Sequence, residues 1–245
     1  MRTGKIQQIL VITDGCSNQG EDPIAMAALA KEQGITVNVI GVMERDIIDE
    51  QGMREIEGIA ASGGGVSQVV YSAQLSQTVQ MVTRKAMNQT IQGVVNRELQ
   101  QILGRFKTME DLPPEERGEV MEVVDELGET VNLEVLILVD ASASMKHKLQ
   151  TVKESLLDLS ISLNARAGRN QFSVFVFPGK KEEVEKILDW TPRLESITSI
   201  FSMITPGGIT PTGPAIRTAL RWFDENRPLR SLIEQNDEAY IEESM

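Results

Sequence analysis

The fold is decided by the stretch LEVLILVDASAS, residues 133–144, in which an apolar run ends in Asp140 and two spaced serines. Such a run is typical of a strand buried on both faces of a parallel sheet. A second run, ILVITDG at residues 9–15, ends in a Thr-Asp-Gly motif. A third motif, GGITPTGP at residues 207–214, opens a predicted helix. Each polar motif therefore follows a predicted strand or begins a predicted helix.

Strands and helices are predicted to alternate in both halves of the chain. The apolar runs indicate strands at residues 9–12, 35–42, 68–71, 133–139, 172–177 and 184–190, the last antiparallel at the sheet edge. Helical patterns lie between them, at residues 23–33, 53–61, 149–163, 194–204 and 214–222. This alternation predicts βαβ units with right-handed crossovers. No sequence repeat relates the two halves, which excludes a tandem duplication.

The middle of the chain has a different pattern. Apolar residues at three-four spacing over residues 75–106 predict one long amphipathic helix, or two joined at Gly93. Pro113 and Pro114 then interrupt the pattern, and an acidic helix is predicted over residues 115–127, ending at Gly128. One interpretation is a helix that covers the sheet followed by a helical linker. The other is a stripe for dimerisation or for binding a partner.

Together, the Asp-x-Ser-x-Ser motif, the loop threonine and the Thr-Asp-Gly motif resemble the metal-ion-dependent adhesion site of von Willebrand factor type A (vWA) domains. In that family the Thr-Asp-Gly strand follows the other two pieces, whereas here it precedes them. The resemblance implies an α/β fold with a doubly wound, mostly parallel, Rossmann-like sheet, helices on both faces and circular permutation. Residues 1–72 would be the C-terminal half of the fold and residues 133–226 its N-terminal half. Residues 73–132 would form the final helix and linker and residues 227–245 an acidic tail, with one permuted domain in total.

The permuted arrangement predicts that Asp14 and Asp140 meet. In open parallel sheets, ligands bind in the crevice beyond the carboxyl ends of the strands, where the strand order reverses. The family order is 3-2-1-4-5-6, and the strands before Asp140 and Asp14 match family strands 1 and 4. The two carboxylates should therefore face each other across the reversal. Closure within one chain and a domain-swapped homodimer would both produce this site.

The resemblance implies a cation site at the rim of the sheet with five oxygen-bearing residues: Asp140, Ser142, Ser144, Thr210 and Asp14. Carboxylates, hydroxyls and waters are hard ligands that suit Mg²⁺, with Mn²⁺ or Ca²⁺ as alternatives. Ile209 separates Thr210 from the preceding glycine pair, whereas the family has threonine directly after glycine. Thr212 therefore remains an alternative to Thr210. A domain that keeps these residues without using a metal also remains open.

The function implied by the resemblance is noncatalytic: Mg²⁺-dependent binding of an acidic side chain of a partner protein, as an assembly or regulatory adaptor. The alternative is a metal-dependent hydrolase or phosphatase-like enzyme that uses the same residues. Several features argue against catalysis. A phosphoryl-transfer enzyme of the haloacid dehalogenase type needs an acid-base aspartate at the position of Ser142. Serine hydrolysis needs a positioned base, and the chain has one histidine, His147, in the first turn after Ser144. No phosphate-binding glycine loop of the P-loop or Rossmann type follows a strand.

Charge and composition exclude several other classes of partner. The chain of 245 residues has 24 basic and 36 acidic residues and a net charge of -12. This balance argues against binding to nucleic acid or to an anionic membrane. No apolar run approaches the roughly 20 residues that a membrane span requires. The single cysteine, Cys16, excludes an internal disulfide framework and suits a reducing compartment, so we expect a cytoplasmic protein.

Overall fold

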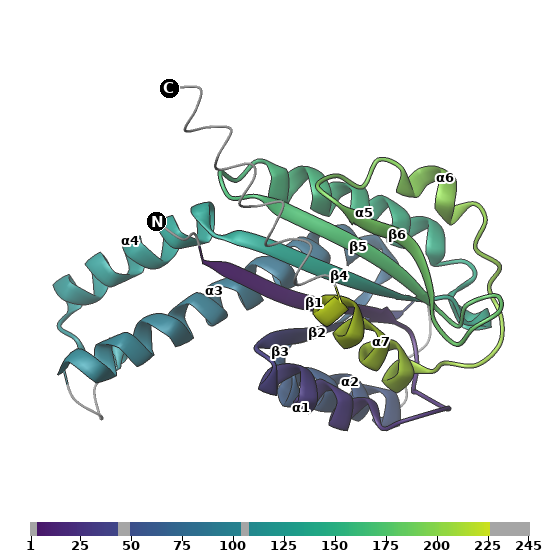
Figure 1. Ribbon diagram of the computed structural model, residues 1–245, viewed down its shortest axis with the longest axis horizontal. Helices are drawn as coiled ribbons and strands as arrows, with labels where there is room; N and C mark the ends of the chain where they lie inside the picture. The colour runs from purple at the N-terminus through teal and green to yellow at the C-terminus, as the bar shows by residue number, and fades with distance from the viewer. Residues whose placement is uncertain (1–3, 44–49, 104–107, 226–245) are drawn as a thin grey trace.

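The computed structural model describes residues 4–43, 50–103 and 108–225, which contain a single six-stranded sheet in the order β3-β2-β1-β4-β5-β6 (Figure 1). Its strands are β1 (Lys5–Thr13), β2 (Ile35–Met43), β3 (Gly64–Tyr71), β4 (Asn132–Asp140), β5 (Asn170–Phe177) and β6 (Glu185–Thr191). Neighbouring strands are parallel except for β6, which runs antiparallel to β5. The predicted antiparallel edge strand is therefore confirmed.

The centre of the sheet joins the two halves of the chain. Strands β1 and β4 pair in parallel, with Lys5 opposite Asn132 and Ile12 opposite Val139. Successive side chains of a strand point to opposite faces. In β1, Leu10 packs into one apolar core and Val11 into the other, and both side chains are fully buried. Burial on both faces explains why these strands are continuous apolar runs.

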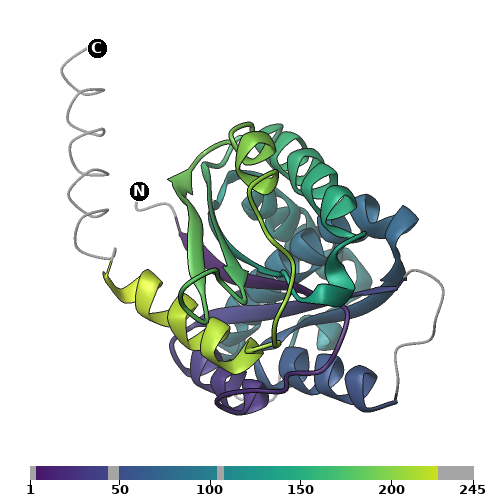
Figure 2. The ribbon, with the colours of Figure 1, turned by 90° about the vertical axis from the view of Figure 1, so that its right-hand side faces the viewer.

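Helices cover both faces of the sheet, as Figure 2 shows from the end where the parallel strands finish. One face carries α1 (Pro23–Glu32), α2 (Glu50–Ser62) and α7 (Thr212–Glu225). The other carries α3 (Leu75–Leu103), α5 (Leu149–Asn164) and the short helix α6 (Ile197–Phe201). The predicted doubly wound α/β class is confirmed. No helix in the described part of the chain combines the length and apolarity that a bilayer crossing requires.

The segment between β3 and β4 forms two long helices that lie side by side and extend beyond the sheet (Figure 1). Helix α3 is continuous through Gly93, so the single-helix alternative is correct. Helix α4 (Pro114–Thr130) continues past Gly128, where the sequence predicted its end. A Cβ atom at Gly128 would lie 3.2 Å from Oδ1 of Asn88 in α3. This glycine therefore allows close packing of the two helices and does not end α4.

Several other boundaries differ from the prediction, among them the start of β1, which begins at Lys5 and not at residue 9. Strand β3 begins at Gly64, because the backbone of Gly65 approaches the Val37 carbonyl so closely that a Cβ atom would lie 2.2 Å from its oxygen. Helix α6 is shorter than the predicted span of residues 194–204. The predicted tail, residues 227–245, lies outside the described residues. The division of the chain at residues 72, 132 and 226 stays a prediction.

Candidate functional site

The two aspartates meet at the carboxyl ends of the central strands. Asp140 is the last residue of β4, and Asp14 directly follows Thr13, the last residue of β1. The chain leaves β1 toward β2 on one side of the sheet and leaves β4 toward β5 on the other. The aspartates therefore lie where the strand order reverses, the usual position of a ligand crevice in such sheets. The predicted meeting of these two residues is confirmed.

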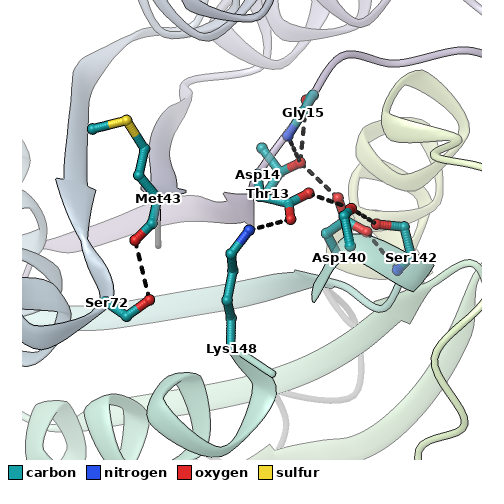
Figure 3. Close-up of polar contacts among 9 residues, drawn as sticks. Thr13, Asp14, Gly15, Met43, Ser72, Asp140, Ser142 and Lys148 are labelled. Atoms are coloured by element: carbon teal, nitrogen blue, oxygen red, sulfur yellow. Dashed lines mark hydrogen bonds and ion pairs between the residues drawn. The ribbon is translucent and has the colours of Figure 1, made fainter. Parts of the chain in front are cut away.

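Asp140 is fully buried, so the expectation that it lies on the rim is wrong. Its Oδ2 accepts a hydrogen bond of 2.7 Å from the Thr13 hydroxyl (Figure 3), and its Oδ1 accepts one of 2.7 Å from the Ser142 backbone N–H. Burial raises the pKa of the Asp140 carboxyl to about 6, because removal from water disfavours the charged form. Hydrogen bonds from Thr13 and from the backbone and side chain of Ser142 oppose this shift, and the nearby Asp14 adds to it. Both donor residues are neutral, so neither compensates the charge of this carboxylate.

The Asp14 carboxylate faces a pair of hydroxyls. Its Oδ1 accepts a hydrogen bond of 2.8 Å from Ser144 Oγ, which lies 3.1 Å from Ser142 Oγ. Neighbouring oxygens around an octahedral Mg²⁺, with bonds of about 2.0–2.1 Å, are separated by roughly 2.9 Å. The three oxygens therefore have the spacing of adjacent ligands, and the donor set suits a hard divalent cation. The described residues contain no cluster of three or more His, Cys, Asp or Glu side chains able to hold a metal, so any cation here would depend on hydroxyls.

Lys148, which the sequence did not indicate as a site residue, joins Asp14, Asp140, Ser142 and Ser144 in one polar cluster. Its Nζ lies 2.5 Å from Oδ2 of Asp14 (Figure 3), and the two side chains are only 11% and 4% exposed. Lys148 directly precedes α5, and a short 3-10 turn over Ala143–Met145 brings it back toward β1. A signal was present in the sequence, because a lysine four residues after Ser144 can reach the same pocket after one turn. The spacing alone did not indicate a partner for it.

The glycine loop before α7 is fixed between the two aspartate loops. The Gly207 N–H donates to the Ala141 carbonyl at 2.9 Å, beside Asp140. The Thr210 N–H donates to Oδ1 of Asn18 at 2.8 Å, and the Asn18 N–H donates back to the Thr210 carbonyl at 3.1 Å. These bonds tie the third motif to the loops that follow β4 and β1. All three motifs therefore belong to one region of the molecule.

Close backbone contact holds the start of α7 against the loop that follows β1. A Cβ atom at Gly213 would lie 1.9 Å from the Glu21 carbonyl oxygen. Gly20 has a φ of 86°, a conformation that L side chains rarely adopt, and a Cβ atom there would lie 2.3 Å from the ring of Pro214. The two glycines allow these segments to approach closely. The contact fixes the position of Thr210 relative to Asp14.

Both candidate threonines are buried near this contact. Thr210 is 7% exposed, and its backbone makes the paired hydrogen bonds to Asn18. Thr212 begins α7, is 1% exposed, and has a hydroxyl without a hydrogen-bond partner. A buried hydroxyl without a partner is unusual and calls for an explanation. The choice between the two threonines as a cation ligand stays a prediction.

Comparison with known proteins gives a consistent result. A family model described as von Willebrand factor type A domain matches residues 135–241, and a second model with the same description matches residues 1–85. The uncharacterized protein YabS of Bacillus subtilis (strain 168) is 63% identical over 245 residues, which cover the whole of both chains. The two models thus match separate parts of the chain, one in each half.

Solved structures resemble this chain to different degrees. The crystal structure of an uncharacterized protein from Alicyclobacillus acidocaldarius aligns with a TM-score of 0.85 and 43% identity, covering 91% of this chain and 96% of that one. Proximal thread matrix protein 1 from the mussel byssus, with a zinc-occupied MIDAS motif, aligns with a TM-score of only 0.26 and 18% identity. That alignment covers 83% of this chain and 43% of the mussel protein, a similarity too low to inform the fold or the site.

Proposed function

Because this chain belongs to the von Willebrand factor type A domain family, whose members generally mediate protein–protein interaction, we propose that it binds a carboxylate of a partner protein through a divalent cation. The role is noncatalytic, as an assembly or regulatory adaptor. The observation that carries this proposal is the row of three oxygens formed by Asp14 Oδ1, Ser144 Oγ and Ser142 Oγ. Their spacing suits adjacent ligands of one cation, and they lie at the switch point of the sheet.

Five residues would hold the cation: Asp140, Ser142, Ser144, Thr210 and Asp14, with Thr212 as the alternative threonine. Ser144 is exposed, whereas Asp140 is buried, so the cluster opens to solvent on the serine side. With two carboxylates at most, these residues would leave a bound Mg²⁺ electrophilic, with a coordination position for an outside oxygen. An acidic side chain of a partner is the proposed source of that oxygen.

We also propose that the domain is circularly permuted. Two models of one family match separate parts of the chain, and β1 and β4 pair at the centre of the sheet. A chain rearranged to run from residue 131 to 225, then through a short linker to residues 4–103, restores the family order of strands. We expect it to fold and to keep any Mg²⁺ response of the native protein. An unfolded product, seen by circular dichroism, would argue against the permuted relationship.

The test of the cation site is a thermal shift with Mg²⁺ or Mn²⁺ at millimolar concentration. The wild-type protein should gain several degrees in Tm, because a ligand that binds only the folded state stabilises it. Ser144→Ala should lose most of this gain, since it removes an exposed hydroxyl from the oxygen row. Ser144 is a better target than Asp140, whose removal would leave the Thr13 hydroxyl and the Ser142 N–H unsatisfied.

The matched control is Ser72→Ala. Ser72 lies at the same end of the sheet, but its hydroxyl donates to the Met43 carbonyl at 3.2 Å and not to either aspartate (Figure 3). This variant should respond to the cation as the wild type does. No gain in Tm for the wild type with either cation would refute the proposed site. Binding of a partner protein that requires both Mg²⁺ and Ser144, and that EDTA abolishes, would then test the interaction itself.

A further inference from the structure

The ion pair between Lys148 and Asp14 has no role in the proposed binding of a cation. Lys148 Nζ contacts Oδ2 of Asp14, while Ser144 donates to Oδ1 of the same carboxylate. Both charged side chains are almost fully shielded from water. Taking two charges out of water is costly, and a well-packed apolar side chain at such a position is often equally stable. Packing alone therefore does not explain a lysine at this position.

The ammonium of Lys148 sets the net charge of the proposed cation site. Within the cluster, Asp14 and Asp140 are the acidic groups and Lys148 supplies the ammonium. With a divalent cation bound and both carboxylates ionised, the cluster carries one positive charge in excess. Without Lys148, the same cluster would be neutral and would have little attraction for an anion. The lysine also repels the cation, because two like charges that share one carboxylate lie only a few ångströms apart.

We propose that Lys148 is a specificity-determining residue that lowers the affinity of the site for divalent cations and in exchange makes the loaded site attract one carboxylate. This inference rests on the proposed function, since it assigns Lys148 a role at the same cation site. The ammonium shares the Asp14 carboxylate with the cation and stays beside it. The preferred ligand is therefore a singly charged anionic group, such as the side chain of Asp or Glu.

The experiment uses Mn²⁺ alone as the first probe, with free Mn²⁺ measured by electron paramagnetic resonance. Lys148→Met keeps most of the aliphatic stem and removes the charge. We expect it to bind Mn²⁺ at least about tenfold more tightly than the wild type. Lys148→Arg keeps the charge and should stay within about threefold of the wild type. The matched control, Lys146→Met, makes the same change of net charge at an exposed lysine two residues away and should leave Mn²⁺ affinity unchanged.

The second probe is sodium acetate at constant ionic strength, added to the Mn²⁺-loaded proteins. Acetate that reaches the bound ion displaces water, and the enhancement of water proton relaxation falls. Lys148→Met should need at least about threefold more acetate than the wild type for the same fall, because its loaded site lacks the excess positive charge. Lys146→Met should match the wild type.

The outcomes separate the two proposals. Tighter Mn²⁺ binding together with weaker acetate binding in Lys148→Met supports the role of Lys148. If the wild type binds Mn²⁺ and Lys148→Met binds it equally or more weakly, this inference is wrong and the proposed function stands. An unchanged acetate response in Lys148→Met also overturns the inference. If neither protein binds Mn²⁺ at millimolar concentration, the cation site itself is refuted and both proposals fall.

Discussion

The paired central strands β1 and β4 have a buried carboxylate near each end, Glu134 at the amino end of β4 and Asp140 at its carboxyl end. The negative charges of these two carboxylates are balanced differently. Near the amino end of β4, Glu134 lies 3.1 Å from Lys5 Nζ and accepts a hydrogen bond of 2.9 Å from the Gln7 side chain. At the carboxyl end, Asp140 accepts bonds from neutral donors of Thr13 and Ser142. Glu134 has a cationic partner, Lys5, whereas no ion pair joins Asp140 to a lysine or arginine among the residues that the structure describes. This difference fits a structural role for Glu134 and the role proposed for Asp140 at the cation site.

The two ends also differ in how the surrounding chain is held. The amino end of the β1–β4 pair is joined by side-chain contacts across the strands. At the carboxyl end, the loop after β1 and the start of α7 are joined by backbone contacts that leave no room for a Cβ atom. A cation site needs its oxygens held in place before the ion arrives. The close packing of the loop after β1 against α7 would meet that condition for the proposed cation.

The largest expected effect comes from breaking this backbone contact. Gly213→Ala would place a methyl group against the Glu21 carbonyl, and the resulting displacement should lower the free energy of unfolding by about 4 kcal/mol. Chemical denaturation measures the change. Gly207→Ala in the same loop is the control, since a Cβ atom there meets no atom within 4 Å, and it should be nearly neutral. Equal effects for the two variants would contradict the tight contact.

The next largest effect concerns the buried charge of Asp140, and it is measured as the stability of Asp140→Asn in metal-free protein with EDTA. Its pKa is raised by burial to about 6 in the folded state from its usual value of 3.8, so the fold favours the protonated form. The stabilisation is therefore present at low pH and is lost as the pH rises through about 6. Asp140→Asn imitates the protonated form and should be more stable than the wild type above pH 7, by about 3 kcal/mol. Near pH 3, below the usual pKa of 3.8, the two proteins should be equally stable, and a difference that does not vary with pH would contradict the burial argument.

The corresponding substitution at the amino end of β4 should change the free energy of unfolding in the opposite direction. Glu134→Gln removes the negative charge that faces Lys5, whose side chain is 30% exposed and can be partly rehydrated. We expect the free energy of unfolding at pH 8 to fall by about 1–2 kcal/mol, the range for a hydrogen bond to a charged group reduced by this exposure. Urea denaturation of this variant and of Asp140→Asn gives the comparison directly. If both variants were stabilised, the two carboxylates would not differ as described.

The smallest effect distinguishes the two threonines. Thr212→Val replaces a buried hydroxyl without a partner by a methyl group, which should be neutral or stabilising by up to about 1 kcal/mol in metal-free protein. If Thr210 is the ligand, Thr212→Val keeps the wild-type affinity for Mn²⁺ and Thr210→Val weakens it. The reverse result would assign the ligand role to Thr212. Electron paramagnetic resonance of free Mn²⁺ measures both variants.

Much of the fold followed from local patterns in the sequence. The apolar runs of β1 and β4 indicated strands buried on both faces, and the helical pattern predicted from residue 23 matches the start of α1. These features depend on the burial and backbone geometry of neighbouring residues, which the sequence displays directly. Gly128 was misinterpreted because a glycine that ends an element and a glycine that admits a neighbour look alike in the sequence. Only the packing partner distinguishes them.

The sequence by itself determined the α/β class and the residues Asp14, Asp140, Ser142 and Ser144 as members of one cluster, because parallel strands place their carboxyl ends at one edge of the sheet. The tertiary structure decided what surrounds them. The burial of Asp140, the pairing of Lys148 with Asp14 and the contact of Gly213 with Glu21 join residues that are far apart in the chain. Burial and charge compensation are set by all neighbours in space, whereas periodicity and motif spacing record only neighbours along the chain.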